Sequence, residues 1–239
     1  MKLTSTDIEH LSVILSTASL GGVESMIIED GKVRGMNEAR TFVILSDYNV
    51  PKLSQKIGLS RLNTLRSRLN LLAGADMTID ARETERGEIA SLDISAGRSK
   101  VQYRCTATAL IKAPRSINDE PLHVVTFEKD ELKLILDALK VMSAKAVQLI
   151  IKKSGLTSVR ASDETNDAFE TALSSPAELL SEADSVVHSY SADIFHAVLR
   201  ALGQTQVQLI IGVGGTIRTI IEGHEVVIMP KVGEEEEDS

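Results

Sequence analysis

The chain has 239 residues, of which 43% are hydrophobic, and a formal net charge of −8. This length and apolar content allow one large domain or two ordinary domains with real cores. Tryptophan is absent and aromatic residues make up 3% of the chain, which argues against a protein that reads bases by stacking. A single cysteine excludes an internal disulfide. With no signal peptide or membrane-length apolar run visible, we expect a soluble intracellular protein.

The negative charge is concentrated at the C-terminal end of the sequence. The tail EEEEDS, residues 234–239, holds five acidic residues and no basic one, whereas residues 1–110 hold 14 Lys and Arg against 13 Asp and Glu. A run so charged and so poor in apolar residues is not expected to fold. A body with local basic stripes is therefore compatible with the acidic total.

The first half of the chain predicts helix, strands, helix and strands in that order. STDIEHLSVILSTA (residues 5–18) is an amphipathic helix pattern, and the apolar strand ESMIIED (24–30) follows it. A second, short helix is expected in NVPKLSQKIGLSRL (49–62), where Pro51 suits a first helical turn. Strands broken at a glycine turn are expected in LRSRLNLLAGADMTIDA (65–81), and a last strand in KVQYRCTATALI (100–111).

The second half predicts the same order. FEKDELKLILDALKVM (127–142) is a helix opened by an acidic turn, and AVQLIIKKS (146–154) is a strand. YSADIFHAVLRALG (190–203) is a short helix for which Ser191 suits the N-cap. QVQLIIGVGGTIRTIIE (206–222) predicts strands joined at a glycine turn, and EVVIMPKV (225–232) a last strand. Duplication or ordinary α+β alternation would each produce this order.

The segment KAPRSINDEPL, residues 112–122, separates the halves and contains two of the five prolines. It has no hydrophobic periodicity, so we expect an extended linker. The predicted organisation is a first domain of residues 1–111, this linker, a second domain of residues 123–233 and an acidic disordered tail, 234–239. Antiparallel sheets joined by hairpins fit poorly with a Rossmann-like enzyme.

The helix pattern KDELKLILDALK, residues 129–140, has two distinct faces. At about 100° per residue, five apolar side chains gather on one side: Leu132, Ile135, Leu136, Leu139 and Met142. Three lysines fall within about 40° of one another on another side: Lys129, Lys133 and Lys140. From the pattern alone, the lysines are either an incidental solvated face or a surface that presents positive charge.

Catalytic and metal-binding motifs are not recognisable. GVGG at 212–215 is followed by a β-branched alternating run, which indicates a hairpin turn in place of a phosphate cradle. The five histidines lack paired spacing with a carboxylate, and DETND at 163–167 lacks the glycine and terminal glutamate of a calcium loop. Cys105 lies in an alternating run and is expected to be a half-buried strand residue. We therefore expect no enzyme, no metal and no cofactor.

Two longer stretches and the chain ending carry a resemblance to a known family. GRSKVQYRCTATALIKAP and SDYNVPKLSQKIGLS, with the start MKL, resemble the DNA polymerase sliding clamps of T4-like bacteriophages. The segment MPKV before an acidic tail resembles the closing segment of the cellular and archaeal clamps. The resemblance spans essentially the whole chain and rests on element order, length and ending together.

The resemblance implies an α+β fold with two similar clamp domains, each with two helices on antiparallel sheets. Three copies would form a homotrimeric, pseudo-six-fold ring. Its helices would face duplex DNA with cationic side chains and bind it independently of sequence. The implied DNA-contacting residues are Lys52 and Lys56, one turn apart on the second helix, and Arg61, Lys129, Lys133, Lys140, His196 and Arg200. The first helix departs from the pattern, because it has no Lys or Arg between Asp7 and Ser19.

The resemblance also implies that partners insert a short hydrophobic peptide into a pocket. Its frame would be Leu110, Ile111, Ile117, Leu122, Ile228, Met229 and Pro230. Implied partners are a replicative DNA polymerase, an ATP-dependent clamp loader and a late-transcription sigma-like factor, in the cytoplasm of an infected bacterium. A cellular-type (archaeal) clamp remains an alternative, although MNEARTFVIL lacks the acidic and histidine pattern expected there. A two-domain β-rich assembly protein that binds no DNA is a further alternative.

Overall fold

The computed structural model describes residues 2–3, 5–47, 56–72, 77–163, 165, 167–181, 183–203 and 205–231. This part of the chain contains the helices α1 (Ser5–Leu20), α2 (Leu62–Leu71), α3 (Lys129–Val141) and α4 (Ala192–Ala201), and the 3-10 turn η2 (Thr108–Leu110). Among the described residues, no helix is both long and apolar enough to cross a membrane.

Seventeen strands accompany these helices in the described ranges. Those that lie before the middle of the chain are β1 (Lys2–Leu3), β2 (Ser25–Glu29), β3 (Lys32–Met36), β4 (Phe42–Asp47), β5 (Ile57–Ser60), β6 (Met77–Glu83), β7 (Ile89–Ala96) and β8 (Ser99–Arg104). Those that follow are β9 (Pro121–Phe127), β10 (Ala146–Ile151), β11 (Thr157–Ser162), β12 (Ala168–Ala172), β13 (Glu178–Leu179), β14 (Val186–Ser191), β15 (Val207–Gly212), β16 (Ile217–Ile221) and β17 (His224–Ile228).

The chain divides into two compact units. The first comprises Met1–Ile117 with Glu222–Val226, and the second comprises Asn118–Ile221 with Val227–Ser239. The main boundary falls within the segment 112–122 that we predicted as a linker, whereas 222–226 clusters with the first unit. It does so because β17 lies beside β4, and the Ser46 hydroxyl hydrogen-bonds Nδ1 of His224 at 2.7 Å.

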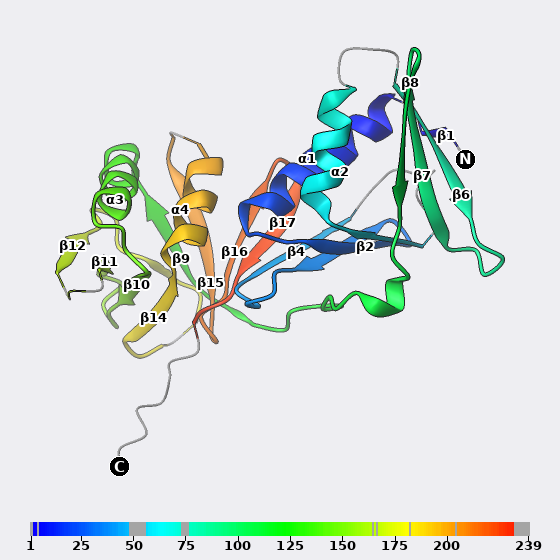
Figure 1. Ribbon diagram of the computed structural model, residues 1–239. Helices are drawn as coiled ribbons and strands as arrows, with labels where there is room; N and C mark the ends of the chain where they lie inside the picture. The colour runs from blue at the N-terminus through cyan, green and yellow to red at the C-terminus, as the bar shows by residue number, and fades with distance from the viewer. Residues whose placement is uncertain are drawn as a thin grey trace. The chain divides into compact units, whose positions relative to one another are not determined.

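The first unit contains two antiparallel groups of strands and two helices. One sheet has the order β1-β6-β7-β8, and β4, β3, β2 and β5 are hydrogen-bonded neighbours in that order. Helices α1 and α2 pack side by side within this unit (Figure 1). Their apolar residues, including Leu11, Ile14, Leu15, Leu65 and Leu69, are at most 2% exposed, so burial of one side of each helix forms the core.

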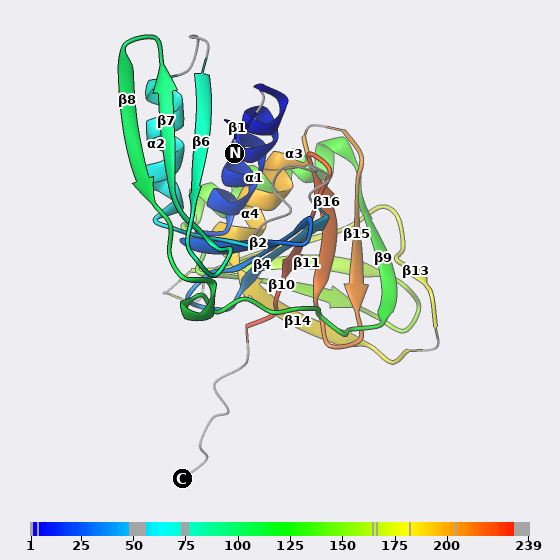
Figure 2. The same ribbon diagram turned by 90° about the vertical axis from the view of Figure 1, so that its right-hand side faces the viewer.

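The second unit repeats this arrangement. One antiparallel sheet has the order β12-β11-β10-β14, and the strands β13, β9, β15 and β16 are neighbours in that order. Helices α3 and α4 lie side by side within this unit (Figures 1 and 2). An aromatic cluster joins strands and helix, because the Phe195 ring stacks on Tyr190 and meets Phe127 edge-on, with centroids 6.0 and 6.4 Å apart.

The predicted fold class is confirmed, since each half has two helices and antiparallel strands. The predicted position of the second helix is wrong. Residues 57–60 of the segment expected to be helical form strand β5, and the helix α2 occupies Leu62–Leu71, where we predicted strands. The expected start of α4 is confirmed at Ser191, although the Ser191 side chain makes no capping hydrogen bond.

The turn between β15 and β16 depends on one carboxylate, that of Asp119. Its Oδ1 accepts a hydrogen bond from the Gly214 N–H at 2.7 Å, and its Oδ2 accepts from the Thr216 N–H at 3.1 Å and the Thr216 hydroxyl at 2.6 Å. A Cβ at Gly212 would lie 2.2 Å from that carboxylate. The glycines of GVGG are therefore needed for a turn that closes on Asp119, as the sequence predicted for a hairpin.

The pKa of Asp119 gives these bonds a pH dependence. Burial raises the pKa, but the hydrogen bonds from Thr216 and Gly214 and the charge of Arg218 outweigh burial, so the pKa lies below its ordinary value. A depressed carboxyl pKa contributes stability above the unfolded pKa of about 3.9, and that stability is lost as pH falls through the folded pKa.

We expect Asp119→Ala to lower the free energy of unfolding by about 2 kcal/mol at pH 7, because three donors lose a charged acceptor. Urea unfolding at pH 7 measures this difference. The difference should shrink as pH falls below about 3.9 and through the lower pKa of folded Asp119, where the wild-type carboxylate becomes protonated. The control Glu120→Ala removes an exposed side chain beside it and should change stability by less than about 0.5 kcal/mol. Equal losses in both variants would contradict this account of the turn.

Candidate nucleic-acid interface

Helix α3 presents lysines on the side opposite its buried residues. Leu132, Ile135 and Leu139 are at most 5% exposed, as the apolar spacing predicted, whereas Leu136 and Met142 are half-buried. Exposed side chains on the other side include three lysines: Lys129, Lys133 and Lys140. All three predicted lysines therefore lie on the solvent-exposed side of α3.

The first turn of α3 explains why the helix begins where the sequence suggested. The Glu131 carboxylate accepts a hydrogen bond from the Glu128 N–H at 2.9 Å, which satisfies a backbone donor that the helix leaves unpaired. Burial raises the pKa of Glu131, but bonds from the Glu128 and Ser174 backbone outweigh it and lower the pKa. The ionised Glu131 carboxylate thus stabilises both the start of α3 and the backbone at Ser174.

Helix α4 has the same division into buried and polar sides. Ala192, Ile194, Phe195, Val198 and Leu199 are buried. Arg200 is exposed and His196 is half-buried, four residues apart and therefore on one side of the helix. Their predicted location on the second helix of this unit is confirmed.

A hollow of about 360 Å³ lies where α3 ends and α4 begins. Lys140 lines it from the last turn of α3, Lys145 from the following loop, and His196 from α4. Asp193 is a lining carboxylate as well. Two lysines and one carboxylate therefore line the hollow, a grouping of basic residues that no single sequence segment carries.

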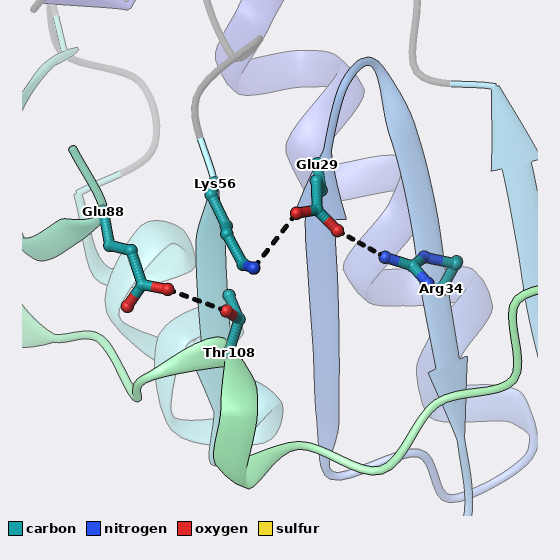
Figure 3. Close-up of polar contacts among 5 residues, drawn as sticks. All are labelled: Glu29, Arg34, Lys56, Glu88 and Thr108. Carbon is teal, nitrogen blue, oxygen red and sulfur yellow. Dashed lines mark hydrogen bonds and ion pairs between the residues drawn. The ribbon is translucent and has the colours of Figure 1, made fainter. Parts of the chain in front are cut away.

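The predicted cations of the first unit are placed differently from our expectation. Lys52 lies outside the described residues. Lys56 is not on a helix, because its backbone pairs with that of Glu88 in an isolated β-bridge just before strand β5. The Lys56 ammonium lies 3.1 Å from the Glu29 carboxylate. Glu29 also binds Arg34 at 2.6 Å (Figure 3). Lys56 therefore does not have the helical position that the sequence predicted for it.

Arg61 immediately precedes α2 and is exposed. Its backbone is left-handed, with φ 54°, and its guanidinium lies 5.8 Å from the centre of the Tyr103 ring. The Tyr103 ring is buried, so Arg61 is held beside the start of α2 by a cation–π contact.

Two arginines on α2, Arg66 and Arg68, were missed by the sequence reasoning. Arg66 donates to the Ser19 hydroxyl of α1 at 2.9 Å, and Arg68 donates to the Gln102 carbonyl at 3.0 Å. Arg66 also lines a hollow of about 270 Å³ with Ser12 and Ser16 of α1. Positive charge beside α1, which has no Lys or Arg of its own, is thus supplied by α2.

A helical signal for α2 was present in the sequence. Leu62, Leu65, Leu69 and Leu72 recur at spacings of three and four residues, and all four are buried. The alternation of arginine with other residues at 65–69 resembles a strand and hid this signal. Reading the leucine spacing over the longer window would have found both arginines.

Nucleophilic and metal chemistry has little support in the described residues. Burial raises the pKa of the Cys105 thiol to about 12, so the reactive thiolate is disfavoured. Within the described ranges, no group of three His, Cys, Asp or Glu residues could hold a metal ion. His123 is 1% exposed, and burial lowers its pKa, as does the neighbouring His188. Burial also lowers the pKa of the half-buried His188, although the charge of Asp119 opposes this shift.

Comparison with known proteins gives structural matches only. No protein-family model matches the sequence, and no curated protein matches it. The chain is similar in structure to A. fulgidus PCNA, solved with the C-terminal region of FEN-1 bound, with a TM-score of 0.62, 14% identity and 98% coverage of both chains. The chain is also similar to PCNA2-PCNA3 from Sulfolobus tokodaii, with a TM-score of 0.61 and 16% sequence identity. This match covers 97% of this chain and 99% of that one.

A bacterial protein gives a similar match. The DNA polymerase sliding clamp from Pseudomonas aeruginosa, solved with ligand, has a TM-score of 0.68 at 13% identity and covers 98% of this chain. The chain spans 66% of that clamp's length. The chain has the sliding-clamp fold. At these identities the likeness establishes the fold alone.

The residues predicted for a partner pocket in this clamp fold differ in exposure. Leu110 is 77% exposed, whereas Ile111 is 8% exposed and Ile117 is half-buried in the same unit. In the second unit, Leu122 and Ile228 are buried and the last two predicted residues, Met229 and Pro230, are half-buried. Leu110 is thus the most accessible member, and the pocket itself stays a prediction.

We expect Lys133→Glu with Lys140→Glu to weaken binding to duplex DNA without unfolding the protein, because both side chains are exposed on α3. Loss of two phosphate contacts should reduce the slope of log affinity against log salt by about 2. Fluorescence anisotropy over a salt series measures the slope, and thermal unfolding checks the fold. The matched control, Lys152→Glu with Lys153→Glu, reverses two exposed charges on the β10–β11 turn. The same slope in both double variants would contradict the α3 assignment.

Proposed function

We propose that this protein is a sliding clamp that encircles duplex DNA and tethers a replicative DNA polymerase for processive synthesis. The observation that supports the proposal most is the sliding-clamp fold over 97% or more of the chain in the archaeal and bacterial matches above. Exposed cations on α3 and α4 and the arginines on α2 add the chemistry that a phosphate backbone needs. The protein would act as a scaffold and not as an enzyme.

The proposed mechanism is topological. Lysine and arginine contacts to phosphates carry no sequence information, so they allow movement along the duplex. A closed ring remains linked to the DNA while these contacts exchange. Processivity then depends on enclosure, and the affinity of each helix for DNA can stay low.

Ring closure in this proposal joins strand β8 of one chain to strand β12 of the next. Both strands end a four-stranded sheet in the described residues, so each has one side available for further backbone pairing. Residues 98–104 contain three cations and no acid, whereas 163–172 contain four acids and no cation. Opposite charges on the two edges favour a head-to-tail contact, which closes a ring when the rotation between copies allows it.

The finer identity we propose is a T4-like phage clamp that works as a homotrimer. Its partners would be a replicative polymerase, an ATP-dependent clamp loader and a late-transcription factor, with Leu110 and Met229 near the partner pocket. A cellular-type clamp is the second candidate, because the chain matches 98% of the length of A. fulgidus PCNA. Both candidates share the enclosure of DNA, whereas a non-DNA-binding assembly protein does not.

We expect the protein to stay on nicked circular DNA through a high-salt wash after loading by its clamp loader and ATP. Salt weakens phosphate contacts steeply, but it weakens backbone pairing and apolar packing at subunit interfaces far less. Linearising the circle with a restriction enzyme should then release the protein within the assay. Retention is measured by gel filtration of the DNA. Equal retention on circular DNA and on linear DNA with free ends would refute the clamp function.

We expect Glu170→Lys to disrupt the ring, because it brings a cation of β12 against Lys100 and Arg104 of β8. The double variant Glu170→Lys with Lys100→Glu should restore assembly by exchanging the two charges. Light scattering reads the result as three times the chain mass of 25.9 kDa or as a smaller species. A Glu170→Lys variant with unchanged mass at micromolar concentration would mean that other edges close the ring.

A further inference from the structure

The hollow between α3 and α4 lies next to the last described residue of the chain. The backbone N–H of Lys231 donates to the Ser189 carbonyl at 2.7 Å, which fixes this residue on strand β14. Its ammonium donates to the Lys145 carbonyl at 2.9 Å. Lys145 lines the hollow with Lys140 and His196, so the last described residue, Lys231, lies at the rim of a hollow that contains two lysines.

The sequence beyond Lys231 has the opposite charge. Residues 234–238 are Glu-Glu-Glu-Glu-Asp, and only Val232 and Gly233 separate them from Lys231. Three residues span at most about 10 Å of extended chain, so Glu234 reaches the neighbourhood of Lys145 without further rearrangement. A tether this short raises the effective concentration to the order of mM, at which weak ionic contacts are populated.

We propose that the acidic segment 234–238 binds in the Lys140–Lys145–His196 hollow of its own chain and competes there with nucleic acid. Carboxylates and phosphates share the chemistry that this hollow recognises, namely anionic oxygens facing lysine ammonium groups. DNA therefore has to displace the segment before it contacts this part of the second unit. The contact itself does not depend on the proposed clamp function, whereas the competition with DNA rests on it.

Two features of the hollow favour the chain's own acidic segment as the occupant. Lys145 both lines the hollow and accepts the Lys231 ammonium at its backbone carbonyl, so the hollow shares a residue with the end at which the described chain is anchored. Asp193 adds one carboxylate to the lining, which opposes the binding of a second anion and favours a contact that exchanges. A permanent contact would block the DNA surface, and a weak one discourages only loosely bound nucleic acid.

A zero-length carbodiimide cross-link tests the contact on the full chain in the absence of DNA. The reagent joins carboxylates to amines in direct contact, and mass spectrometry locates the products. We expect segment 234–238 to be joined mainly to Lys140 and Lys145. The internal reference is Lys152, an exposed lysine at the far end of β10, about 23 Å from Lys145 by strand rise.

Mixed unlabelled and 15N-labelled protein shows whether each cross-link lies within one chain. Cross-links on Lys152 as frequent as those on Lys145, products mainly between chains, or no products of segment 234–238 would each overturn the proposal. Because the experiment contains no DNA, its result is independent of whether the protein proves to be a clamp.

Neutralising the segment, with Glu234 to Glu237 changed to Gln and Asp238→Asn, tests the competition. We expect affinity for linear duplex DNA to rise about threefold at about 50 mM salt and the gain to fade near 200 mM, where charges are screened. In a Lys140→Gln, Lys145→Gln background the same neutralisation should give no gain, which isolates the coupling between segment and hollow. An equal gain in both backgrounds would show general repulsion of DNA by the acidic segment and overturn the proposal. If no variant binds DNA, the clamp function fails and the cross-link map still decides the contact.

Discussion

The burial of one side of each helix is the constraint on which the rest of this structure depends. On α3, Leu132, Ile135 and Leu139 must face the core, and the 3.6-residue period then fixes the lysines on the solvent side. On α4, burial of Phe195 and Val198 places Arg200 outside in the same way. The arrangement of positive charge on these helices is therefore a consequence of packing, and charge can vary without loss of the core.

The second unit was predicted more accurately than the first for a physical reason. In α3 and α4 the apolar spacing and the acidic first turn both indicate a helix, so local and global preferences agree. In α2 the arginines at 66 and 68 imitate strand alternation, and Pro51 offered a helix start upstream that the described residues 56–60 do not continue. Local patterns competed there, and the buried leucines decided the outcome.

The candidate site was less predictable than the fold because its contacts join distant segments. Arg66 reaches Ser19 across 47 residues, and Lys231 reaches Lys145 across 86. Lys56 was expected to face DNA from a helix, but its partner Glu29 lies on a neighbouring strand, β2. Helical periodicity predicts which side of an element a residue occupies, but it does not predict which side chains meet after folding. The hollow at Lys140 and Lys145 could therefore be seen only in three dimensions.

As the clamp proposed above, this acidic protein would hold DNA through lysines, so its positive charge must be concentrated on the surface that faces the duplex. A uniformly basic surface would bind any duplex outside the ring and slow the movement that a clamp requires. Here a net charge of −8 coexists with three exposed lysines on α3, so the acidic total does not prevent local attraction of a phosphate backbone. Such attraction is weak and sensitive to salt, which makes it unsuitable for retention and suitable for sliding. In the proposed clamp, retention would then come from the sheet edges that join subunits, so that helices would contact the DNA and strands would close the ring.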